Sequence, residues 1–147
     1  MKIICLSVGK KHDKVLADAI EQYQTRLSGF VNFSFEYIPT GDVKSESAVI
    51  LKFLKDEDEV ILLDETGRTV TNAELASDLE SAMNKSTKRT VFIIGGAYGV
   101  NQQVKDRSNK IYSLSKLVFP HQIVRLLLVE QLYRSFSILS GGKYHHS

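Results

Sequence analysis

The sequence predicts an α/β protein with a mostly parallel sheet that is covered by helices. Short apolar stretches rich in β-branched residues alternate with longer stretches of helical periodicity along the chain. The strand-like stretches are apolar throughout, as expected for strands buried between two layers of helices. Such alternation is typical of a parallel sheet. The sequence shows no internal repeat and no linker, and we expect a single domain over residues 1–147.

The first half of the chain predicts two strands and two helices in alternation. We expect strands over residues 2–8 and 32–38, and helices over residues 13–28 and 45–55. In the second strand Phe33, Phe35 and Tyr37 alternate with polar residues, which predicts one buried face. The first helix stops before Gly29, a common position for glycine.

The second half continues the alternation and ends with the longest helix. We expect strands over residues 60–63 and 90–94, strand-like runs over 111–114 and 117–119, and helices starting at Thr71, over 100–106 and over 120–139. Thr71 and Glu74 have the spacing of a capping box at the start of their helix. The predicted inner face of that helix is Leu75, Leu79, Ala82 and Met83.

The last predicted helix is apolar on more than one side. Its apolar residues are Ile123, Val124, Leu126, Leu127, Leu128, Val129, Leu132, Phe136 and Leu139. A helix that is apolar on several sides must be buried on several sides. In so small a domain a second copy of the chain is the simplest cover, and we expect a homodimer whose interface uses this helix.

Composition and charge exclude several classes of protein. No run approaches the roughly 20 apolar residues that a membrane span needs. The first apolar run stops at Gly9, which is too short for a secretory signal, and the single cysteine, Cys5, allows no internal disulfide framework. We therefore expect a cytoplasmic protein with no membrane partner. The net charge of +2 neither establishes nor excludes a nucleic-acid partner, although Lys10, Lys11 and Lys14 cluster early in the chain.

A ligand pocket is predicted where three strand ends converge. The three segments are Leu63 to Gly67, Gly95 to Gly99, and Leu114 to His121. In an open α/β sheet, ligands collect where several carboxyl ends of strands meet. Taken alone, the turn with Gly95, Gly96 and Gly99 is more often a tight bend than a ligand loop.

Several familiar site motifs are absent. Gly9-Lys10 does not stand in a Walker A loop, and the glycine turn has Ile94 where a dinucleotide fingerprint has its first glycine. The sequence contains no H-E-x-x-H, no paired cysteines and no G-x-S-x-G. It therefore supports neither a metal site nor a serine hydrolase.

Polar residues of the last helix are further candidates. His121 begins that helix, whose N-terminus favours a neutral imidazole, and it is either a capping histidine or a catalytic one. Arg125 lies one turn later on the same face. Glu130 and Arg134 have the same spacing, which favours an ion pair.

Several short motifs, spread from the start to the end of the chain, are weak signals singly but specific in combination. They are Val8-Gly9-Lys10, Val91-Phe-Ile-Ile-Gly-Gly-x-x-Gly99, Ser113-Leu-Ser115, Phe119-Pro-His-Gln-x-x-Arg125, Glu130-Gln-x-Tyr-Arg134 and Tyr144-His145. With this combination the chain resembles the family of large-subunit ribosomal RNA pseudouridine N3-methyltransferases, in the SPOUT or α/β-knot superfamily. The chain departs from the family in a shorter segment between residues 39 and 54 and in its Tyr-His-His-Ser tail.

The resemblance implies a SPOUT methyltransferase fold with a deep trefoil knot near the C-terminus, a homodimer, and S-adenosyl-L-methionine as methyl donor. The implied target is N3 of a pseudouridine in large-subunit (23S) ribosomal RNA of the assembled ribosome. No metal is implied. By motif match, the cofactor-binding positions are Leu63, Gly95, Leu114, Ser115, Lys116, Leu117, Val118 and Phe119, and Gly96 and Gly99 complete the glycine turn.

The implied reaction is direct transfer of the methyl group to N3, whose proton must leave. A base or an anion-stabilising group should assist, and the candidates are His121, Tyr144 and His145. Arg125, like Arg134, suits contacts with a phosphate or an oxyanion. We expect Tyr144 and His145 to lie beside the pocket, ordered by RNA or by the dimer partner.

Two other functions remain open at this point. The first is a knotted RNA-binding or ribosome-associated factor without catalysis, which would not bind S-adenosyl-L-methionine. The second is a generic α/β nucleotide-binding enzyme, which would bind ATP or a dinucleotide instead.

Overall fold

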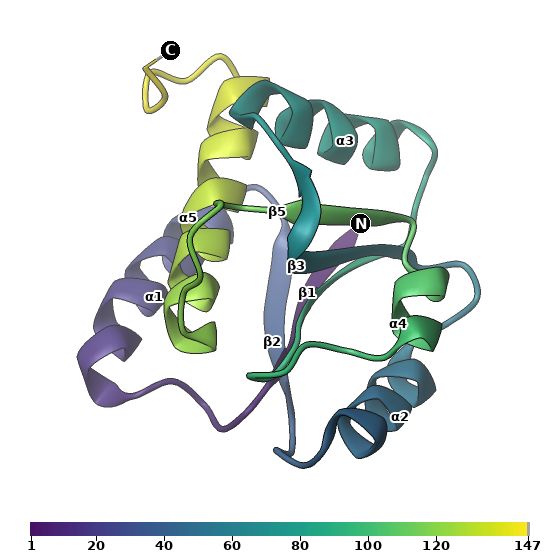
Figure 1. Ribbon diagram of the computed structural model, residues 1–147. Helices are drawn as coiled ribbons and strands as arrows, with labels where there is room; N and C mark the ends of the chain where they lie inside the picture. Colours follow the sequence, from purple (N-terminus) through teal and green to yellow (C-terminus); the bar gives the residue numbers. More distant parts are fainter. Residues whose placement is uncertain (147) are drawn as a thin grey trace.

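A parallel sheet of five strands organises the fold in the computed structural model, which describes residues 1–146 (Figure 1). The strands are β1 (Lys2–Val8), β2 (Asn32–Ile38), β3 (Glu59–Thr69), β4 (Arg89–Ile94) and β5 (Lys110–Ser113). The helices are α1 (Lys14–Leu27), α2 (Val43–Phe53), α3 (Asn72–Asn84), α4 (Gln102–Arg107) and α5 (His121–Leu139). The strand order is β2-β1-β4-β3-β5, and all neighbours are parallel, so the predicted fold class is confirmed.

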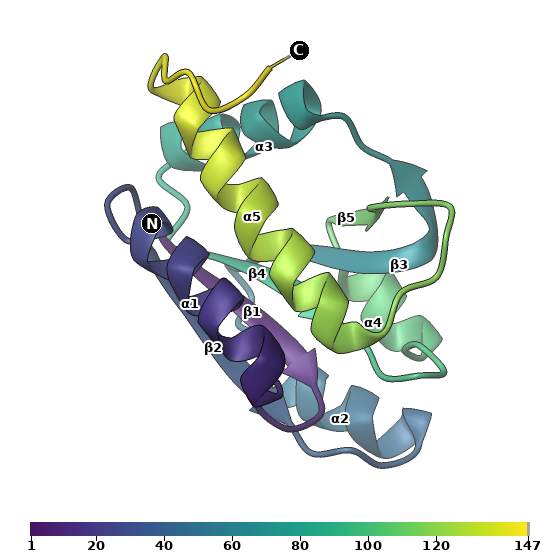
Figure 2. The same ribbon diagram turned by 90° about the vertical axis from the view of Figure 1, so that its left-hand side faces the viewer.

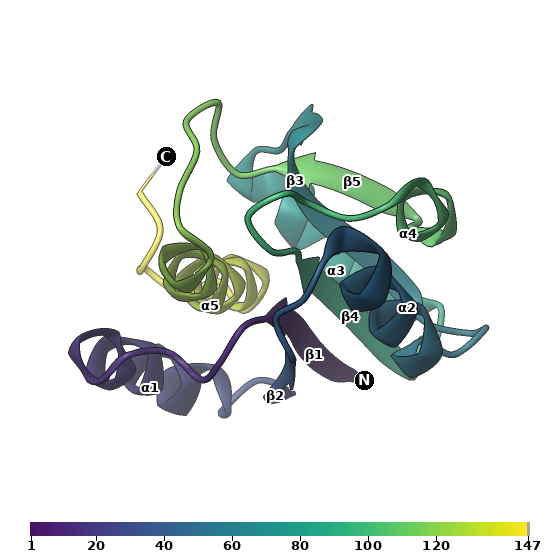
Figure 3. The same ribbon diagram turned by 60° about the horizontal axis from the view of Figure 1, so that its bottom comes forward.

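Helices cover both faces of the sheet. Helices α1, α3 and α5 pack on one face, and α2 and α4 pack on the other (Figures 2 and 3). The connections through α1 and α3 step in one direction across the sheet, and those through α2 and α4 step in the other. Right-handed crossovers produce this arrangement, because reversing the direction of the step moves the helix to the opposite face.

Side chains of the strands alternate between two apolar cores. Ile61 and Phe92 belong to the core beneath α1, α3 and α5. Leu62 and Ile93 belong to the core beneath α2 and α4. Since successive residues of a strand point to opposite faces and both faces are covered, the strands must be apolar throughout. This is the pattern that predicted the parallel sheet.

Helix α5 is buried on three sides within one chain. It packs against α1 on one side, against α3 on the other, and against β1 and β4 beneath. Leu128, Val129 and Leu132 are fully buried there. The apolar residues on several sides of this helix are therefore covered largely by other elements of the same chain. The predicted homodimer stays a prediction, and so does the predicted knot. No helix within residues 1–146 is long and apolar enough to cross a membrane.

Three local predictions are wrong. Strand β3 does not end at Leu63 but continues to Thr69, because β5 pairs with its outer part after a shift in register between Leu63 and Arg68. Residues 117–119 form no strand, because no neighbouring strand pairs with them. Met83 lies in the last turn of α3 and is exposed instead of facing the core.

The predicted cap of α3 is confirmed in part. The Thr71 hydroxyl accepts a hydrogen bond from the Glu74 N–H at 3.1 Å. The Glu74 carboxylate does not return a bond to Thr71 but pairs with Arg68 at 2.5 Å. Glu74 thus links the start of α3 to the outer part of β3.

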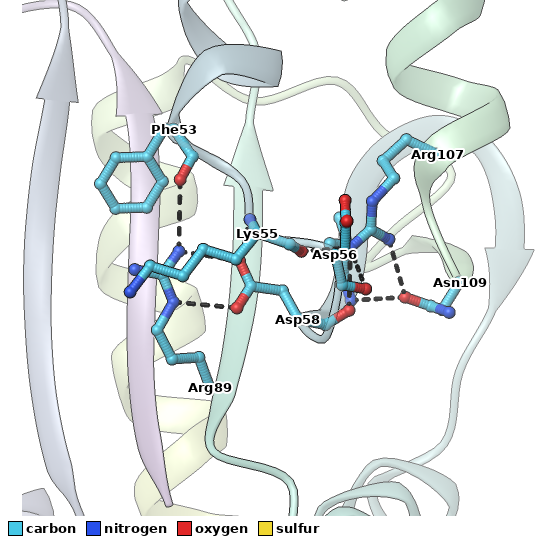
Figure 4. Close-up of polar contacts among 8 residues, drawn as sticks. Phe53, Lys55, Asp56, Asp58, Arg89, Arg107 and Asn109 are labelled. Carbon is cyan, nitrogen blue, oxygen red and sulfur yellow. Dashed lines mark hydrogen bonds and ion pairs between the residues drawn. The ribbon is translucent and has the colours of Figure 1, made fainter.

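A network of arginines joins several segments at the amino ends of the strands (Figure 4). Arg89 donates two hydrogen bonds to Asp58, from Nε to Oδ1 at 2.9 Å and from Nη2 to Oδ2 at 2.7 Å. Asp58 also accepts from the Lys55 N–H at 2.8 Å. Arg107 donates to the carbonyls of Lys55 (2.8 Å) and Asp58 (3.0 Å). The loop between α2 and β3 is therefore bound to both β4 and the end of α4.

Replacing Asp58→Asn should lower the free energy of unfolding by about 3–5 kcal/mol, because it leaves a largely buried guanidinium without its carboxylate. The Asp58 side chain is fully buried and that of Arg89 is 17% exposed. The matched control is Glu59→Gln, which removes a partly exposed ion pair with Lys110 (3.4 Å) and should cost less than about 1 kcal/mol. Urea denaturation measures both. Equal losses of unfolding free energy in the two variants would show that the buried Asp58–Arg89 pair stabilises the fold no more than the partly exposed pair does.

Candidate functional site

A cavity of about 760 Å³ opens at the carboxyl edge of the sheet. Segments 62–66, 94–100 and 113–121 supply most of its lining, and Lys105 of α4 and Val124 of α5 complete it. The volume is that of a small-molecule site. The structure thus brings together the three segments that the sequence predicted to converge, although the first of them, after Leu63, lies within β3 and not at its end.

The register of the sheet explains why these segments meet. Leu63 of β3 lies opposite Ile94 of β4 and opposite Tyr112 of β5. Three adjacent parallel strands therefore reach the same edge at the same height. The chain leaves β4 and β5 into turns at this edge, and beside them β3 shifts its register after Leu63.

The glycine turn after β4 is tight and pressed against α2. The Gly99 N–H donates to the Gly96 carbonyl at 3.0 Å, and Gly99 has a positive φ of +77°. A Cβ atom at Gly96 would lie 2.8 Å from an oxygen of the buried Glu46 carboxylate. Only glycine fits these two positions without strain, so main-chain groups form this part of the cavity wall.

Short-range hydrogen bonds hold the other two segments. Asp64 accepts from the N–H of Thr66 at 2.8 Å and from its hydroxyl at 2.6 Å. Ser113 donates to the Ser115 carbonyl at 2.6 Å, and the Ser115 hydroxyl accepts from the Leu117 N–H at 3.0 Å. The loop after β5 is therefore ordered by its own serines, while Leu117 and the residues after it reach the cavity mouth.

Nearly all of the predicted cofactor-binding positions line the cavity. They are Leu63, Gly95, Gly96, Gly99, Leu114, Ser115, Leu117, Val118 and Phe119. Lys116 is in the same loop but does not line the cavity. Leu117 and Val118 are 70% and 73% exposed, so their apolar side chains are accessible to a ligand.

His121 is the predicted catalytic residue that lines the cavity. Burial, and secondarily the positive charge of Arg125, lower the pKa of His121. The imidazole is therefore neutral at pH 7 and able to accept a proton. The N-cap of α5 is Pro120, which makes no side-chain cap hydrogen bond, and the catalytic role of His121 stays a prediction.

Arg125 lies behind His121 and is fully buried. Its Nε donates to the Ser7 hydroxyl at 2.8 Å, Nη1 to the Lys10 carbonyl at 2.7 Å and Nη2 to the Val8 carbonyl at 3.2 Å. The guanidinium lies 5.0 Å from the centre of the Tyr37 ring. The predicted contact of Arg125 with a phosphate or an oxyanion therefore lacks an accessible donor. In this structure Arg125 positions the end of β1.

The tail leaves α5 at the end of the helix opposite to its start (Figure 2), and Tyr144 and His145 are held against Glu130 and Arg134. The Tyr144 hydroxyl donates to Glu130 at 3.0 Å, and Arg134 donates to Nδ1 of His145 at 3.2 Å. The predicted Glu130–Arg134 ion pair is confirmed at 2.5 Å. Since α5 rises about 1.5 Å per residue, some 20 Å of helix separates Arg134 from His121. Within one chain, the tail does not reach the cavity.

Several lining residues were not among the predicted cofactor-binding or catalytic positions, although all but Lys105 lie in the predicted pocket segments. Asp64 and Thr66 form an Asx-type turn after Leu63, a pattern that the sequence carries. Tyr98, 91% exposed, stands between the glycines of the turn, and Lys105 faces the cavity from the short α4. The position of Lys105 had no sequence signal. Within residues 1–146, no cluster of three or more metal-ligating His, Cys, Asp or Glu side chains occurs.

Comparisons with known proteins match nearly the whole chain to methyltransferases. A family model described as "Predicted SPOUT methyltransferase" matches residues 1–145. Proteins named ribosomal RNA large subunit methyltransferase H from Bacteroides thetaiotaomicron and Porphyromonas gingivalis are each 40% identical, with 99% of both chains covered. A solved probable methylase family protein from Haemophilus influenzae Rd KW20 is similar with a TM-score of 0.57 and 11% identity, over 99% of this chain and 70% of that one. That structural likeness concerns the fold alone.

A second histidine, His12, is buried in the loop between β1 and α1. Its ring packs edge-on against Phe35 at 5.5 Å, and its Nδ1 has no hydrogen-bond partner within residues 1–146. Burial lowers the pKa of His12, and the charges of Arg125 and Lys11 lower it further, against a smaller opposite effect of Glu21. His12 and His121 are thus both held in the neutral form.

The free energy of unfolding should fall as the pH falls below about 6.5, the pKa of histidine in an unfolded chain. Because the folded pKa values of His12 and His121 are lowered, the unfolded chain takes up protons first as the pH falls. The contribution of the two neutral histidines to the free energy of unfolding is complete above that pH. It is lost as the pH falls toward their pKa values in the folded chain. Denaturation at pH values of about 7.5 and 5.5 tests this. His12→Gln/His121→Gln should flatten the difference and His146→Gln, at an exposed position, should not.

Proposed function

The chain belongs to the SPOUT methyltransferase family, and from this premise we propose that it methylates large-subunit ribosomal RNA with S-adenosyl-L-methionine as donor. The proposed target is N3 of a pseudouridine in 23S ribosomal RNA. The names of the relatives from Bacteroides thetaiotaomicron and Porphyromonas gingivalis support the choice of RNA. The motifs of the chain support the choice of nucleotide.

One observation carries the proposal, namely the cavity at the carboxyl edge of the sheet. Its volume of about 760 Å³ suits a ligand of the donor's size. Leu117, Val118 and Phe119 offer apolar surface to an adenine ring, and the turn from Gly95 to Gly99 offers main-chain groups. When bound there, the donor supplies a methyl group that is already activated on a sulfonium, so the reaction requires no metal.

The chain has to remove a proton from the target. The imide nitrogen N3 forms the bond to the methyl carbon while the carbon–sulfur bond breaks, and the N3 proton passes to a base. His121 lines the cavity in its neutral form and is the proposed base. Burial and hydrogen bonds raise the pKa of Tyr144, so its hydroxyl is a hydrogen-bond donor at neutral pH.

We propose that the active form is a homodimer built on α5. Ile123, Leu127 and Ile138 are partly exposed on this helix and lie outside the two apolar cores. A two-fold axis across the middle of α5 would lay two copies antiparallel. The tail of the second copy, with its Tyr144 and His145, would then lie beside His121 of the first.

The proposed substrate is the assembled ribosome in the cytoplasm. A protein that binds bare RNA through many phosphate contacts needs many lysines and arginines. The net charge of +2 is too small for that. Recognition of a larger surface of RNA and protein is consistent with such a charge.

Donor binding tests the proposal directly. Calorimetry should detect binding of S-adenosyl-L-methionine and its demethylated product, and mass spectrometry should detect a methylated pseudouridine in ribosomal RNA after incubation with ribosomes. Val118→Asp should weaken donor binding at least about tenfold, because it places a carboxylate against an apolar ring. Val49→Asp, at an exposed position on α2, is the matched control. Failure to bind the donor favours an inactive RNA-binding factor, and binding of ATP instead favours a nucleotide enzyme.

A mixing experiment tests whether the tail acts across the dimer. At a donor concentration well below the dissociation constant of the Val118→Asp variant, Val118→Asp and Tyr144→Phe/His145→Ala protomers should each be nearly inactive as homodimers. Unfolded and refolded together, they should regain about a quarter of the wild-type activity, because half of the dimers would carry one intact site of two. No recovery in the mixture would show that the tail acts within its own chain, and full activity of Tyr144→Phe/His145→Ala would remove the tail from the mechanism.

A further inference from the structure

The loop between β1 and α1 carries a basic cluster that the cavity does not explain. Lys10 and Lys11 lie in the loop and Lys14 begins α1, and all three side chains are exposed. None of them forms an ion pair in the part of the chain that the structure describes. Unpaired lysines on a surface are common, but they are usually mobile. These lysines stand on a backbone that is held from several sides.

The first of these anchors is Arg125. A fully buried guanidinium is costly unless its hydrogen bonds are satisfied, and the described residues give Arg125 no carboxylate partner. Its donors instead bind the end of β1 and the loop, at Ser7, Val8 and the carbonyl of Lys10. The effect of this buried charge is therefore to fix the backbone from which Lys10 projects.

Three further contacts hold the same loop. The Gly9 N–H donates to the Ile38 carbonyl at 2.8 Å. The Asp13 N–H donates to the side-chain carbonyl of Gln122 at 2.9 Å. His12 is buried against the aromatic residues of β2. The loop is thus braced against both β2 and the first turn of α5.

The braced loop lies beside the base proposed above. A Cβ atom at Gly9 would be 2.8 Å from Nε2 of His121, which lines the cavity. Figures 1, 2 and 3 show the connection from β1 to α1 passing beside the start of α5. On the β3 side, the cavity is lined by Asp64 and Glu65. A polyanion is therefore repelled on that side and attracted on the side of the loop.

We propose that Lys10 and Lys11 bind the RNA phosphates next to the nucleotide that enters the cavity, and that Arg125 is the positioning residue of this contact. The inference rests on the proposed function, because it takes RNA as the substrate. Lysine–phosphate contacts are independent of base sequence and fix the position of a strand. The contacts of Lys10 and Lys11 with phosphates would orient the target base toward His121. Recognition of the base itself would fall to the cavity.

The test is Lys10→Gln/Lys11→Gln, compared with Lys85→Gln/Lys88→Gln. The control pair makes the same change of charge at exposed positions between α3 and β4, at the amino edge of the sheet. Binding to ribosomes and to a fragment of ribosomal RNA is measured as a function of salt at constant magnesium. Each phosphate contact contributes about 0.7–0.9 to the slope of log affinity against log salt.

The Lys10→Gln/Lys11→Gln variant should lose about 1.4–1.8 from this slope and bind RNA about tenfold more weakly at low salt, with KM raised and kcat and donor affinity unchanged. The control pair should behave as wild type. Arg125→Lys keeps the charge but breaks the fork of hydrogen bonds, so it should raise KM and lower the salt slope without changing donor affinity.

Wild-type slope and affinity in Lys10→Gln/Lys11→Gln would overturn the inference, even if methylation is observed. Failure of the wild-type protein to bind the donor would instead contradict the proposed function. The RNA-binding measurement needs no donor and still reports on the loop in that case. An equal loss in the control pair would also overturn the inference, since it would show that general charge and not the loop attracts the RNA.

Discussion

The parallel direction of all five strands is the constraint on which the rest of this structure depends. Strands that run the same way deliver every carboxyl end to one edge and every amino end to the other. At the amino edge, Asp58, Arg89 and Arg107 tie loops together with short hydrogen bonds. At the carboxyl edge, the part of β3 around Leu63 and the connections after β4 and β5 surround a cavity. The network of Asp58, Arg89 and Arg107 and the cavity are thereby separated to opposite edges of the sheet.

Much of this arrangement follows from local sequence. The strands over residues 2–8, 32–38 and 90–94 were predictable because burial on one or both faces leaves a clear apolar pattern, bounded by turn residues. The three strand ends that line the cavity follow from the same pattern and from the rule that parallel strands end together. The outer part of β3, from Asp64 to Thr69, was not predictable. It is polar, and only its pairing with β5 makes it a strand.

The roles of polar residues were harder to predict because they depend on contacts across the chain. Arg125 looked like a phosphate ligand because of its type and its spacing from His121. Its partners Lys10 and Ser7 lie 115 and 118 residues away in sequence, and no local pattern reveals them. The motif that contains Arg125 marked a residue that is fully buried and makes three hydrogen bonds to β1 and the loop after it. It could not distinguish a side chain that touches a substrate from one that holds a loop.

The position of the tail also depends on contacts with residues far from it in the sequence, and it bears on the oligomeric state. Tyr144 is bound to Glu130 in the same chain, nine residues along α5 from His121. Nine residues of helix span about 14 Å, so Tyr144, as it is held in this chain, does not reach the cavity. Either the tail has no part in the reaction, or a second chain running antiparallel along α5 supplies it. The length of α5 therefore links the oligomeric state to the chemistry: a tail that takes part in catalysis requires a dimer.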